Sequence, residues 1–254
     1  MGEKIKDLLQ GFVVAFAMYS KLPMPKIQWT QNNMKYCVCF FPLIVAVEGA
    51  LMLGWFWLAE RLGLGLLMRT AVLILIPVAV TGGIHLDGLL DTADALSSYK
   101  SREEKLEILK DSHAGAFAII VGISYFVLSF GVYSEMTFER LTVLAWGFVL
   151  SRSFSGLGLV MLKKAKNTGL LRTFSDAAAN RRVAVVMGCY IAAVTVAMVL
   201  THPLRGGVCA VMAVLSFLWY RQMAYGKFGG ITGDLAGCFV QTAELAMAVG
   251  VIFC

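Results

Sequence analysis

Long apolar segments recur along the chain, and they constrain its fold more than any other feature of the sequence. Seven of them approach or exceed the ~20 residues that a helix needs to cross ~30 Å of hydrocarbon. They cover residues 37–58, 66–86, 115–134, 141–162, 183–201, 206–220 and 235–253, the sixth being the shortest. Hydrophobic residues make up 59% of the chain and charged residues 15%, whereas charged residues make up about 25% of soluble domains. The sequence therefore predicts an all-α, polytopic membrane protein in which residues 1–254 form a single integral membrane domain.

Basic residues predict how the chain is oriented in the membrane. Lys and Arg number six in residues 163–182 and four in residues 97–113, whereas the three connections on the opposite side carry one each. Alternation of seven spans places both basic segments, the N-terminus and residues 221–234 on one side, which the positive-inside rule assigns to the cytoplasm. Residues 8–18 are apolar but too short to cross, so we expect an interfacial or re-entrant helix there. The sequence therefore predicts a multi-pass membrane protein with these segments on the cytoplasmic face.

Three aspartates follow the second apolar segment: Asp87, Asp91 and Asp94. Steps of four and seven residues return to within ~60° on an α-helix, so the three carboxylates share one face and span about 10 Å. A solvated helix face is one reading of this pattern. A site for Mg²⁺ or Mn²⁺ is the other, because like charges on one face repel unless a cation compensates them, and because these cations prefer carboxylate oxygens. Three nearby glycines would let backbone or a bulky ligand approach closely; they are Gly82, Gly83 and Gly88.

Two further polar segments lie on the same predicted face. Lys110, Asp111 and Ser112 end a short charged helix just before the chain re-enters the membrane, where a phosphate or metal contact is one reading and plain solvation the other. A glycine-rich loop precedes the last span, whose helix Thr232 or Asp234 could cap. Helix N-termini behind glycine loops bind phosphates, whereas a carboxylate there equally suits a cation. A single active site on the cytoplasmic face could draw on all of these segments.

Ionisable groups also lie within the predicted spans, where they are costly and need a partner or a polar cavity. Arg152, in the fourth span, needs an anion, which is either Glu48 of the first span or a substrate phosphate. Glu244, in the last span, is either a functional group or a satisfied packing contact. His85 lies ~200° from Asp87 on a continuous helix and so points away from the aspartate face, unless the chain breaks at the preceding glycines. Roles as a metal ligand and as a substrate contact both stay open for it.

With these motifs laid out, the chain closely resembles the cobalamin synthase family, also called adenosylcobinamide-GDP ribazoletransferases, over nearly its whole length. The most specific match is the block from His85 to Asp94, which joins His-Leu-Asp-Gly to Asp-x-x-Asp. The other matching pieces are Leu22–Pro25, Phe40–Leu43, Lys110–Ser112 before Gly115, Ser151–Arg152 and Gly229–Asp234. The resemblance implies Mg²⁺-dependent transfer of adenosylcobinamide phosphate from its GDP-activated form to a hydroxyl of α-ribazole or α-ribazole 5′-phosphate. The transfer releases GMP and belongs to cobalamin (vitamin B12) biosynthesis.

The matching positions carry the roles that we predict. Displacement at a phosphoanhydride needs positive charge on the transferring phosphoryl group and a base for the attacking hydroxyl. Expected catalytic residues are Asp87, Asp91, Asp94 and Asp111. Expected ligands of Mg²⁺ are Asp87, Asp91, Asp94 and Asp234. Expected substrate contacts are Gly82, Gly83, His85, Gly88, Lys110, Ser112, Arg152, Thr232 and Glu244.

Two other functions compete with this one. A CDP-alcohol phosphotransferase-like enzyme also holds metals with spaced aspartates at a membrane face, but its Asp-Gly-x-x-Ala-Arg opening is missing after Asp87. A secondary transporter would have inverted repeats and a site near the bilayer midplane, and we find no internal repeat. The net charge of +6 suits anionic headgroups or substrates, and we expect no nucleic-acid partner. Whether copies associate into a homo-oligomer stays open.

Overall fold

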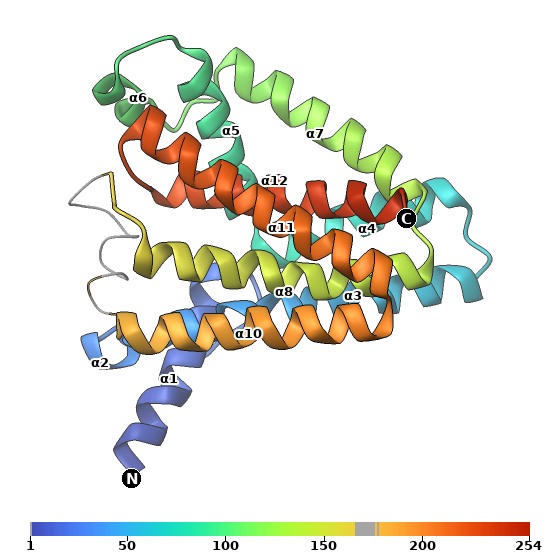
Figure 1. The fold of residues 1–254 in the computed structure, drawn as a ribbon, viewed down its shortest axis with the longest axis horizontal. Coiled ribbons are helices and arrows are strands. Elements are labelled where there is room, and N and C mark those ends of the chain that lie inside the picture. The colour runs from blue at the N-terminus through green and yellow to red at the C-terminus, as the bar shows by residue number, and fades with distance from the viewer. Residues whose placement is uncertain (1, 166–175, 177) are drawn as a thin grey trace.

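Helices make up all the named elements of the computed structural model, which describes residues 2–165, 176 and 178–254 (Figure 1). The long helices are α1 (Gly2–Tyr19), α3 (Phe41–Arg61), α4 (Leu66–Thr81), α5 (Ile84–Ser97), α7 (Ala116–Ser134), α8 (Phe138–Met161), α10 (Asn180–Thr201), α11 (Pro203–Met223) and α12 (Gly233–Ile252). Shorter elements are α2 (Gln31–Met34), the 3-10 helix η1 (Cys37–Phe40), α6 (Arg102–Ile108) and the π-helix η2 (Ala224–Phe228). The predicted all-α class is therefore confirmed.

Helix length and composition bear out the prediction of about seven transmembrane helices. In the described ranges, six helices are long and apolar enough to cross a membrane: α3 with η1, α7, α8, α10, α11 with η2, and α12. The pair α4 and α5 gives a seventh when its two helices are taken together. Helix α1 is not among these six, and in Figure 1 it projects from the lower left of the bundle, at an angle to α8 and α10.

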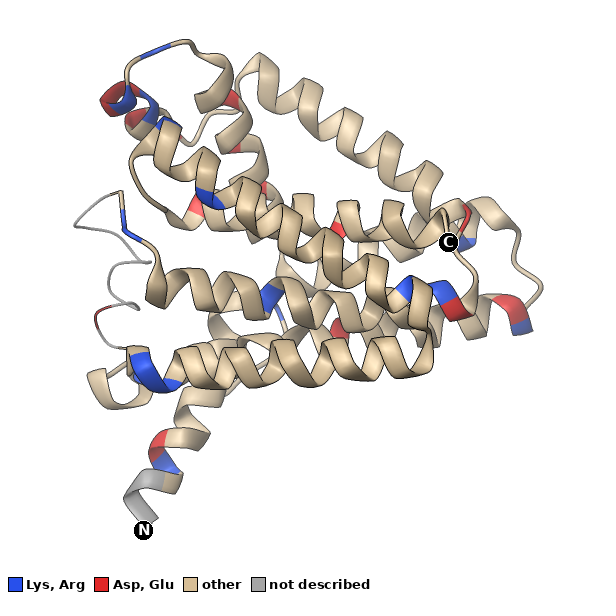
Figure 2. Cartoon of the chain, viewed as in Figure 1, with Lys and Arg blue, Asp and Glu red and all other residues tan. Residues whose placement is uncertain are grey.

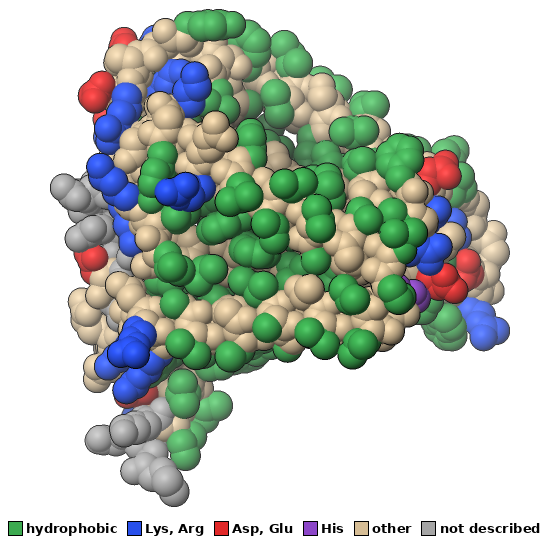
Figure 3. Space-filling view, in the orientation of Figure 1, with side chains coloured by type: hydrophobic (Ala, Val, Ile, Leu, Met, Phe, Trp, Pro, Cys, Tyr) green, Lys and Arg blue, Asp and Glu red, His purple; other side chains and the backbone are tan. Residues whose placement is uncertain are grey.

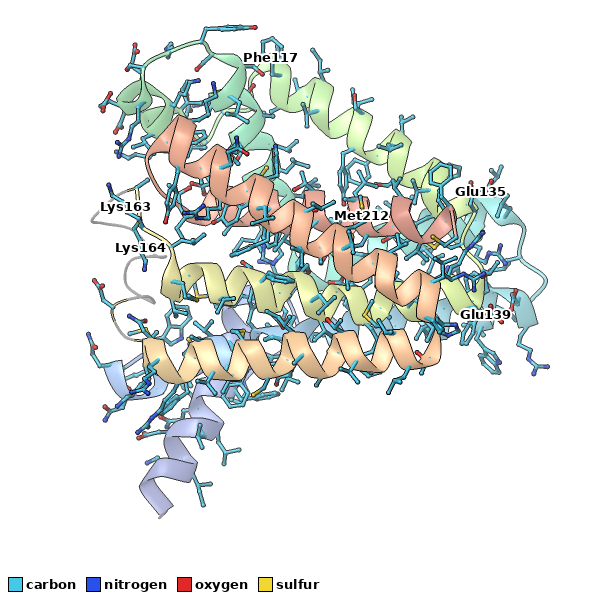
Figure 4. The ribbon with its side chains drawn as sticks, viewed as in Figure 1. Phe117, Glu135, Glu139, Lys163, Lys164 and Met212 are labelled. Carbon is cyan, nitrogen blue, oxygen red and sulfur yellow. The ribbon has the colours of Figure 1, made fainter. Side chains whose placement is uncertain are left out.

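Most charged residues lie toward the two ends of the bundle, and few lie in its middle (Figure 2). Figure 3 shows hydrophobic side chains covering the middle of the same face. Lys163 and Lys164 lie at one end, Glu135 and Glu139 at the other, and Met212 between them (Figure 4). This distribution is what a chain crossing a hydrocarbon layer requires, because ionised groups are expensive at its centre. Lys166 and Arg172, two of the basic residues on which the predicted orientation rests, lie outside the described residues.

The second predicted span is not one continuous helix, which corrects the expectation from the sequence. Helix α4 ends at Thr81, and the axis of α5 is bent from it by 94°. Gly82 and Gly83 between them have φ angles of +67° and +78°, a left-handed conformation that residues with a Cβ rarely adopt. The hydroxyl of Thr81 donates to the Pro77 carbonyl (2.8 Å) and accepts from the Gly83 N–H (3.3 Å). Helix α4 has only 16 residues, so we take it as the membrane-crossing part of the broken pair and α5 as lying across its end, at the membrane face.

Helix α8 lies in the interior of the bundle and packs against α3, α10, α11 and α12. Small residues let the helices approach, as membrane interfaces require. A Cβ atom placed on Gly49 of α3 would lie 2.9 Å from the Cβ of Ala145, and one on Gly147 would lie 2.9 Å from the Sγ of Cys209. Large side chains such as Phe148 fill the space between these contacts. This close packing fixes the positions from which the polar end of the molecule is built.

The polar connections that the topology predicts on one side do meet at one end of the bundle. The Ile231 N–H donates to the Lys163 carbonyl (2.8 Å), and the Ala165 N–H donates to the Ile231 carbonyl (2.9 Å). The guanidinium group of Arg102, at the start of α6, lies against Gly229. Helices α5, α6 and α12 therefore share this end with the segment that follows α8 (Figure 1).

Candidate active site

Helices α5 and α12 cross in backbone contact, which brings their aspartates together. A Cβ atom placed on Gly88 would lie 2.5 Å from the carbonyl oxygen of Asp234, so this crossing requires glycine. One turn further along α12, a Cβ atom on Gly237 would lie 3.1 Å from the carbonyl oxygen of His85. Thr232 caps α12 as predicted, because its Oγ1 accepts a backbone N–H three residues on (3.2 Å). The same hydroxyl lies 3.3 Å from Oδ2 of Asp234 and donates to it.

The charges of four other aspartates act on the carboxyl group of Asp91. Burial, and then the charges of Asp87, Asp234, Asp94 and Asp111, raise the pKa of its carboxyl to about 7. All of these causes act in the same direction, because each of them disfavours the charged form. A bound divalent cation would reverse them, since it would be the largest local charge. The choice between a cation site and a solvated helix face stays a prediction.

Asp94 differs from the other aspartates of α5 because its charge already has a partner. Its Oδ2 accepts the N–H of Gly115 (2.7 Å) and its Oδ1 accepts the N–H of Ala118 (2.9 Å). These groups belong to the first turn of α7, where unpaired N–H donors and the helix dipole favour a negative charge. Asp94 thus caps α7 from a neighbouring helix. The sequence predicts its position on the shared face but not this second role.

The described residues contain no group of three or more carboxylate, imidazole or thiol side chains that is arranged to hold a metal ion. The chemistry of the donors nevertheless fits Mg²⁺, because Asp87, Asp91 and Asp234 offer carboxylate oxygens, and because burial and the charges of Asp87 and Asp234 raise the pKa of Asp91. Mg²⁺ commonly keeps several waters and binds through one or two carboxylates together with substrate phosphates. A ready-made site with three protein ligands is therefore not required.

Two cavities open beside these aspartates. The first holds about 190 Å³ and lies among α1, η1, α3, α5, α8 and α12, with a largely apolar lining. The second holds about 540 Å³, is wider and more polar, and lies between the end of α1 and the α4–α5 bend; Lys21, Gly82 and Gly83 line it. Asp87 lines both cavities. Its carboxylate therefore stands where two bound molecules would meet.

The predicted substrate contacts before α7 are exposed in this structure. Asp111 accepts the N–H of His113 (3.0 Å) and pairs with its Nδ1 (2.7 Å), and these hydrogen bonds hold the pKa of Asp111 below its usual value. Lys110 donates to the carboxylate of Glu107 (2.6 Å), and Ser112 is exposed. Asp111 is close enough to act on Asp91 electrostatically. Substrate contact by these residues stays a prediction.

Arg152 pairs with a carboxylate inside the bundle, as one of its two predicted readings requires. Its Nη1 donates to Oε1 of Glu244, which also accepts from Oγ of Ser151 (2.7 Å). Glu48, the expected partner, has its Oε2 4.0 Å from Nη2 of Arg152 and is the more distant of the two glutamates. Arg152 and both glutamates are buried. The arrangement favours the structural reading of Arg152 and Glu244, and their predicted contact with substrate stays untested.

His85 is buried between aromatic rings and lines the smaller cavity. Its ring centroid lies 6.4 Å from that of Tyr19 and 5.9 Å from that of Phe41. The atom Nε2 is buried and makes no hydrogen bond. A buried ring nitrogen without a partner is costly, and in a functional site it calls for an explanation.

Sequence reasoning missed the contribution of the N-terminal helix to this site. Tyr19 lines the smaller cavity, Lys21 lines the larger one, and the N–H of Lys21 donates to the Val80 carbonyl (2.7 Å). The signal was present in the sequence, because Ser20 and Lys21 are the first polar residues after the apolar segment and precede a matching Leu-Pro-Met-Pro motif. Their distance in sequence from the aspartates concealed the contact.

Comparisons with known proteins identify the family of this chain. A family model described as cobalamin-5-phosphate synthase matches residues 11–252. An adenosylcobinamide-GDP ribazoletransferase of Lachnoclostridium phytofermentans is 44% identical over 96% of this chain and 94% of its own. Proteins of the same name from Geotalea daltonii and Clostridium botulinum are 30% and 27% identical, and each alignment covers at least 94% of both chains. No solved structure matches. The chain belongs to the cobalamin-5-phosphate synthase family.

Proposed function

We propose that this protein joins adenosylcobinamide-GDP to α-ribazole or α-ribazole 5′-phosphate, giving adenosylcobalamin or its 5′-phosphate and GMP. In this transfer a hydroxyl oxygen of the acceptor bonds to the phosphorus that carries cobinamide, the bond from that phosphorus to the oxygen of GMP breaks, and the hydroxyl proton passes to a base. The observation that carries the proposal is the aspartate cluster at the α5–α12 crossing, in a chain of this family.

The aspartates have different proposed roles because their surroundings differ. Asp87 lines both cavities, so it is the carboxylate best placed to accept the proton of an attacking hydroxyl. Asp94 positions α7 by capping its first turn. Lys21, in the wider cavity, is the cation best placed to contact the diphosphate of the donor. The apolar walls of the smaller cavity would limit the access of water to Asp87 from the side on which the acceptor binds, which would slow hydrolysis of the activated phosphate before the acceptor arrives.

Mg²⁺ is the cofactor that we propose, and one or two of the carboxylates of Asp87, Asp91 and Asp234 would hold it together with substrate phosphates. When bound, Mg²⁺ supplies positive charge that stabilises the transferring phosphoryl group and the leaving nucleotide. Burial and the charges of the neighbouring aspartates raise the pKa of Asp91 to about 7, and this supports the assignment because a cation would relieve the repulsion between the carboxylates.

The assay is made with protein purified in detergent, Mg²⁺ and both substrates. We expect cobalamin or its 5′-phosphate and GMP to form in equal amounts, and little GMP to form from adenosylcobinamide-GDP alone. Equally fast release of GMP without the acceptor would make the protein a hydrolase. Turnover of CDP-diacylglycerol with an alcohol would favour the lipid enzyme, and ion-dependent uptake into proteoliposomes without bond cleavage would favour the transporter.

We propose the cell (inner) membrane of a prokaryote as the location, with the active site on the cytoplasmic face. Cysteines replacing Lys163 and Glu135, which lie at opposite ends of the bundle (Figure 4), test this orientation on a background without the six native cysteines. In intact cells an impermeant maleimide should label only the cysteine at 135. Labelling at 163 instead would reverse the orientation, and labelling at both would contradict the spanning topology.

A further inference from the structure

The smaller cavity beside Asp87 has the dimensions of a site for one small, flat group. It holds about 190 Å³, whereas pockets for drug-sized ligands hold roughly 300–1,000 Å³. Aliphatic side chains such as Ile84, Leu159 and Ala236 line it together with the ring of Phe41. Burial of an apolar aromatic group here would be favourable, at roughly 25 cal/mol per Å² of apolar surface.

One polar atom inside this apolar enclosure lacks a partner. His85 is 6% exposed and lines the cavity, and its Nε2 makes no hydrogen bond. The ring is held by Tyr19 and Phe41 on neighbouring helices, so it is fixed before any ligand arrives. A ligand that is apolar except for one hydrogen-bonding nitrogen would satisfy the orphan atom and bury its remaining surface.

The open end of the cavity fixes the direction in which such a ligand would point. Asp87 and Asp234 lie in the lining together with residues of α8 such as Ser155. Asp87 also lines the wider cavity, which Lys21 makes suitable for a diphosphate. A molecule with its base in the apolar cavity would therefore hold its hydroxyl groups toward the aspartates and the second cavity.

We infer that the smaller cavity is the site of the acceptor, and that it takes the dimethylbenzimidazole base of α-ribazole with His85 as the hydrogen-bond partner of the unsubstituted ring nitrogen. This inference rests on the proposed function and assigns the acceptor to one of the two cavities. Nε2 of His85 donates to the base nitrogen, the two methyl groups lie among the aliphatic side chains, and the ribose extends toward Asp87. Neither His85 nor Ala236 takes part in the chemical step, so they are positioning and specificity residues.

The other large groups of the two substrates fit this cavity poorly. A corrin macrocycle is several times larger than 190 Å³. Guanine would fit by size, but its several polar edge atoms would lose their hydrogen bonds to water against apolar walls, at a cost of roughly 1–3 kcal/mol for each unpaired group. The base of α-ribazole has a single free nitrogen and two methyl groups, and it avoids both penalties.

Ala236→Leu tests the assignment because it narrows the cavity from α12. Overpacking by about 1–3 kcal/mol corresponds to roughly tenfold or more in affinity, so the KM for α-ribazole should rise about tenfold, while the KM for adenosylcobinamide-GDP stays constant. The KM for the riboside of unsubstituted benzimidazole, which lacks the two methyl groups, should rise much less in this variant than the KM for α-ribazole. Ala246→Leu is the matched control, because Ala246 is on the same helix, is half-buried as Ala236 is, and lies outside the cavity.

His85→Phe and His85→Gln separate hydrogen bonding from packing. Phenylalanine keeps the aromatic contacts and removes the donor, so α-ribazole should bind about tenfold more weakly, as loss of one buried hydrogen bond predicts. Glutamine restores an N–H donor and should recover part of the affinity. Equilibrium dialysis of α-ribazole without the donor substrate gives a readout that does not depend on turnover, and thermal melting verifies that each variant folds.

The outcomes distinguish this inference from the proposed function. If wild-type protein forms no cobalamin, the proposed function fails whatever the variants do. If it forms cobalamin but Ala236→Leu behaves like Ala246→Leu, only the acceptor site is refuted. A rise in the KM for adenosylcobinamide-GDP with that for α-ribazole unchanged would assign the cavity to the donor and would also overturn the inference.

Discussion

The molecule contains two clusters of ionisable groups, and they differ in how their charge is balanced. In the bundle interior, Arg152 pairs with Glu244 and has Glu48 4.0 Å away, so one cation shares a buried site with two carboxylates. At the α5–α12 crossing, burial and the charges of four other aspartates raise the pKa of Asp91 to about 7. The interior cluster contains its own cation and can serve the fold alone. The aspartate cluster would take its cation from outside, and this difference is the basis on which we propose it as the functional site.

The largest effect should come from removing the cation of the interior cluster. Arg152→Met leaves Glu48 and Glu244 buried without their cation, and losing one partner of a buried ion pair typically costs about 3–5 kcal/mol of stability. The melting temperature in detergent should fall sharply. Lys163→Met, which removes an exposed cation just after the same helix, should change stability by less than ~0.5 kcal/mol. An Arg152→Met protein as stable as wild type would show that the pair is dispensable for the fold.

The second largest effect should be a loss of turnover when the aspartate cluster at the α5–α12 crossing is changed. Asp91→Asn keeps the shape of the side chain but removes a proposed metal ligand, so turnover should fall by at least about a hundredfold, the loss expected when one group that stabilises transition-state charge is removed. Product formation is measured at saturating Mg²⁺, with Glu139→Gln at the opposite end of the bundle as control. Normal activity of Asp91→Asn under these conditions would refute the assignment, and activity that persists in EDTA would refute the metal.

The number of spans and the grouping of the polar segments could both be predicted from the sequence, because each rests on local composition. Apolar length identifies helices that cross a membrane, and alternation then decides which connections meet. The bend at Gly82 and Gly83 could not be predicted in the same way. Two glycines permit a left-handed turn without requiring it, and the 94° angle depends on how α5 packs against α12.

Within the site, spacing predicts which aspartates share a face but not what each of them contacts. The Arg152 partner illustrates the limit, since Glu48 and Glu244 are both intramembrane carboxylates and only the packing of α12 on α8 brings Glu244 nearer. The cap that Asp94 provides to α7 and the cavity contacts of Tyr19 and Lys21 join residues far apart in the chain. Such contacts follow from tertiary packing, which no local pattern encodes.

The smallest predicted effect compares two aspartates one turn apart on the same helix, in metal-free protein. Asp91 repels its neighbours at i−4 and i+3, and each like-charge pair of this kind costs about 0.2–0.5 kcal/mol, so Asp91→Asn should raise stability in EDTA by roughly 0.4–1 kcal/mol. Asp94 accepts two N–H groups at the start of α7 (2.7 and 2.9 Å). Asparagine would keep only one acceptor oxygen and lose the charge, so Asp94→Asn should lower stability by about 1 kcal/mol.

The stability of the metal-free protein should also depend on pH, and the direction of this dependence can be checked. Because the pKa of Asp91 is raised to about 7 in the folded protein, the folded state holds a proton that the unfolded chain, with a pKa near ~3.9, has released. Stability of the metal-free wild type should therefore fall as the pH rises from about 4 to 7, and the advantage of Asp91→Asn should appear over the same window. Melting curves in EDTA across this range measure both variants. Asp94 has hydrogen-bond partners for its charge, whereas Asp91 is repelled by its neighbours. This difference predicts that the same Asp→Asn change lowers stability at one position and raises it at the other. If both substitutions changed stability in the same direction, the proposed difference between the two aspartates would be wrong.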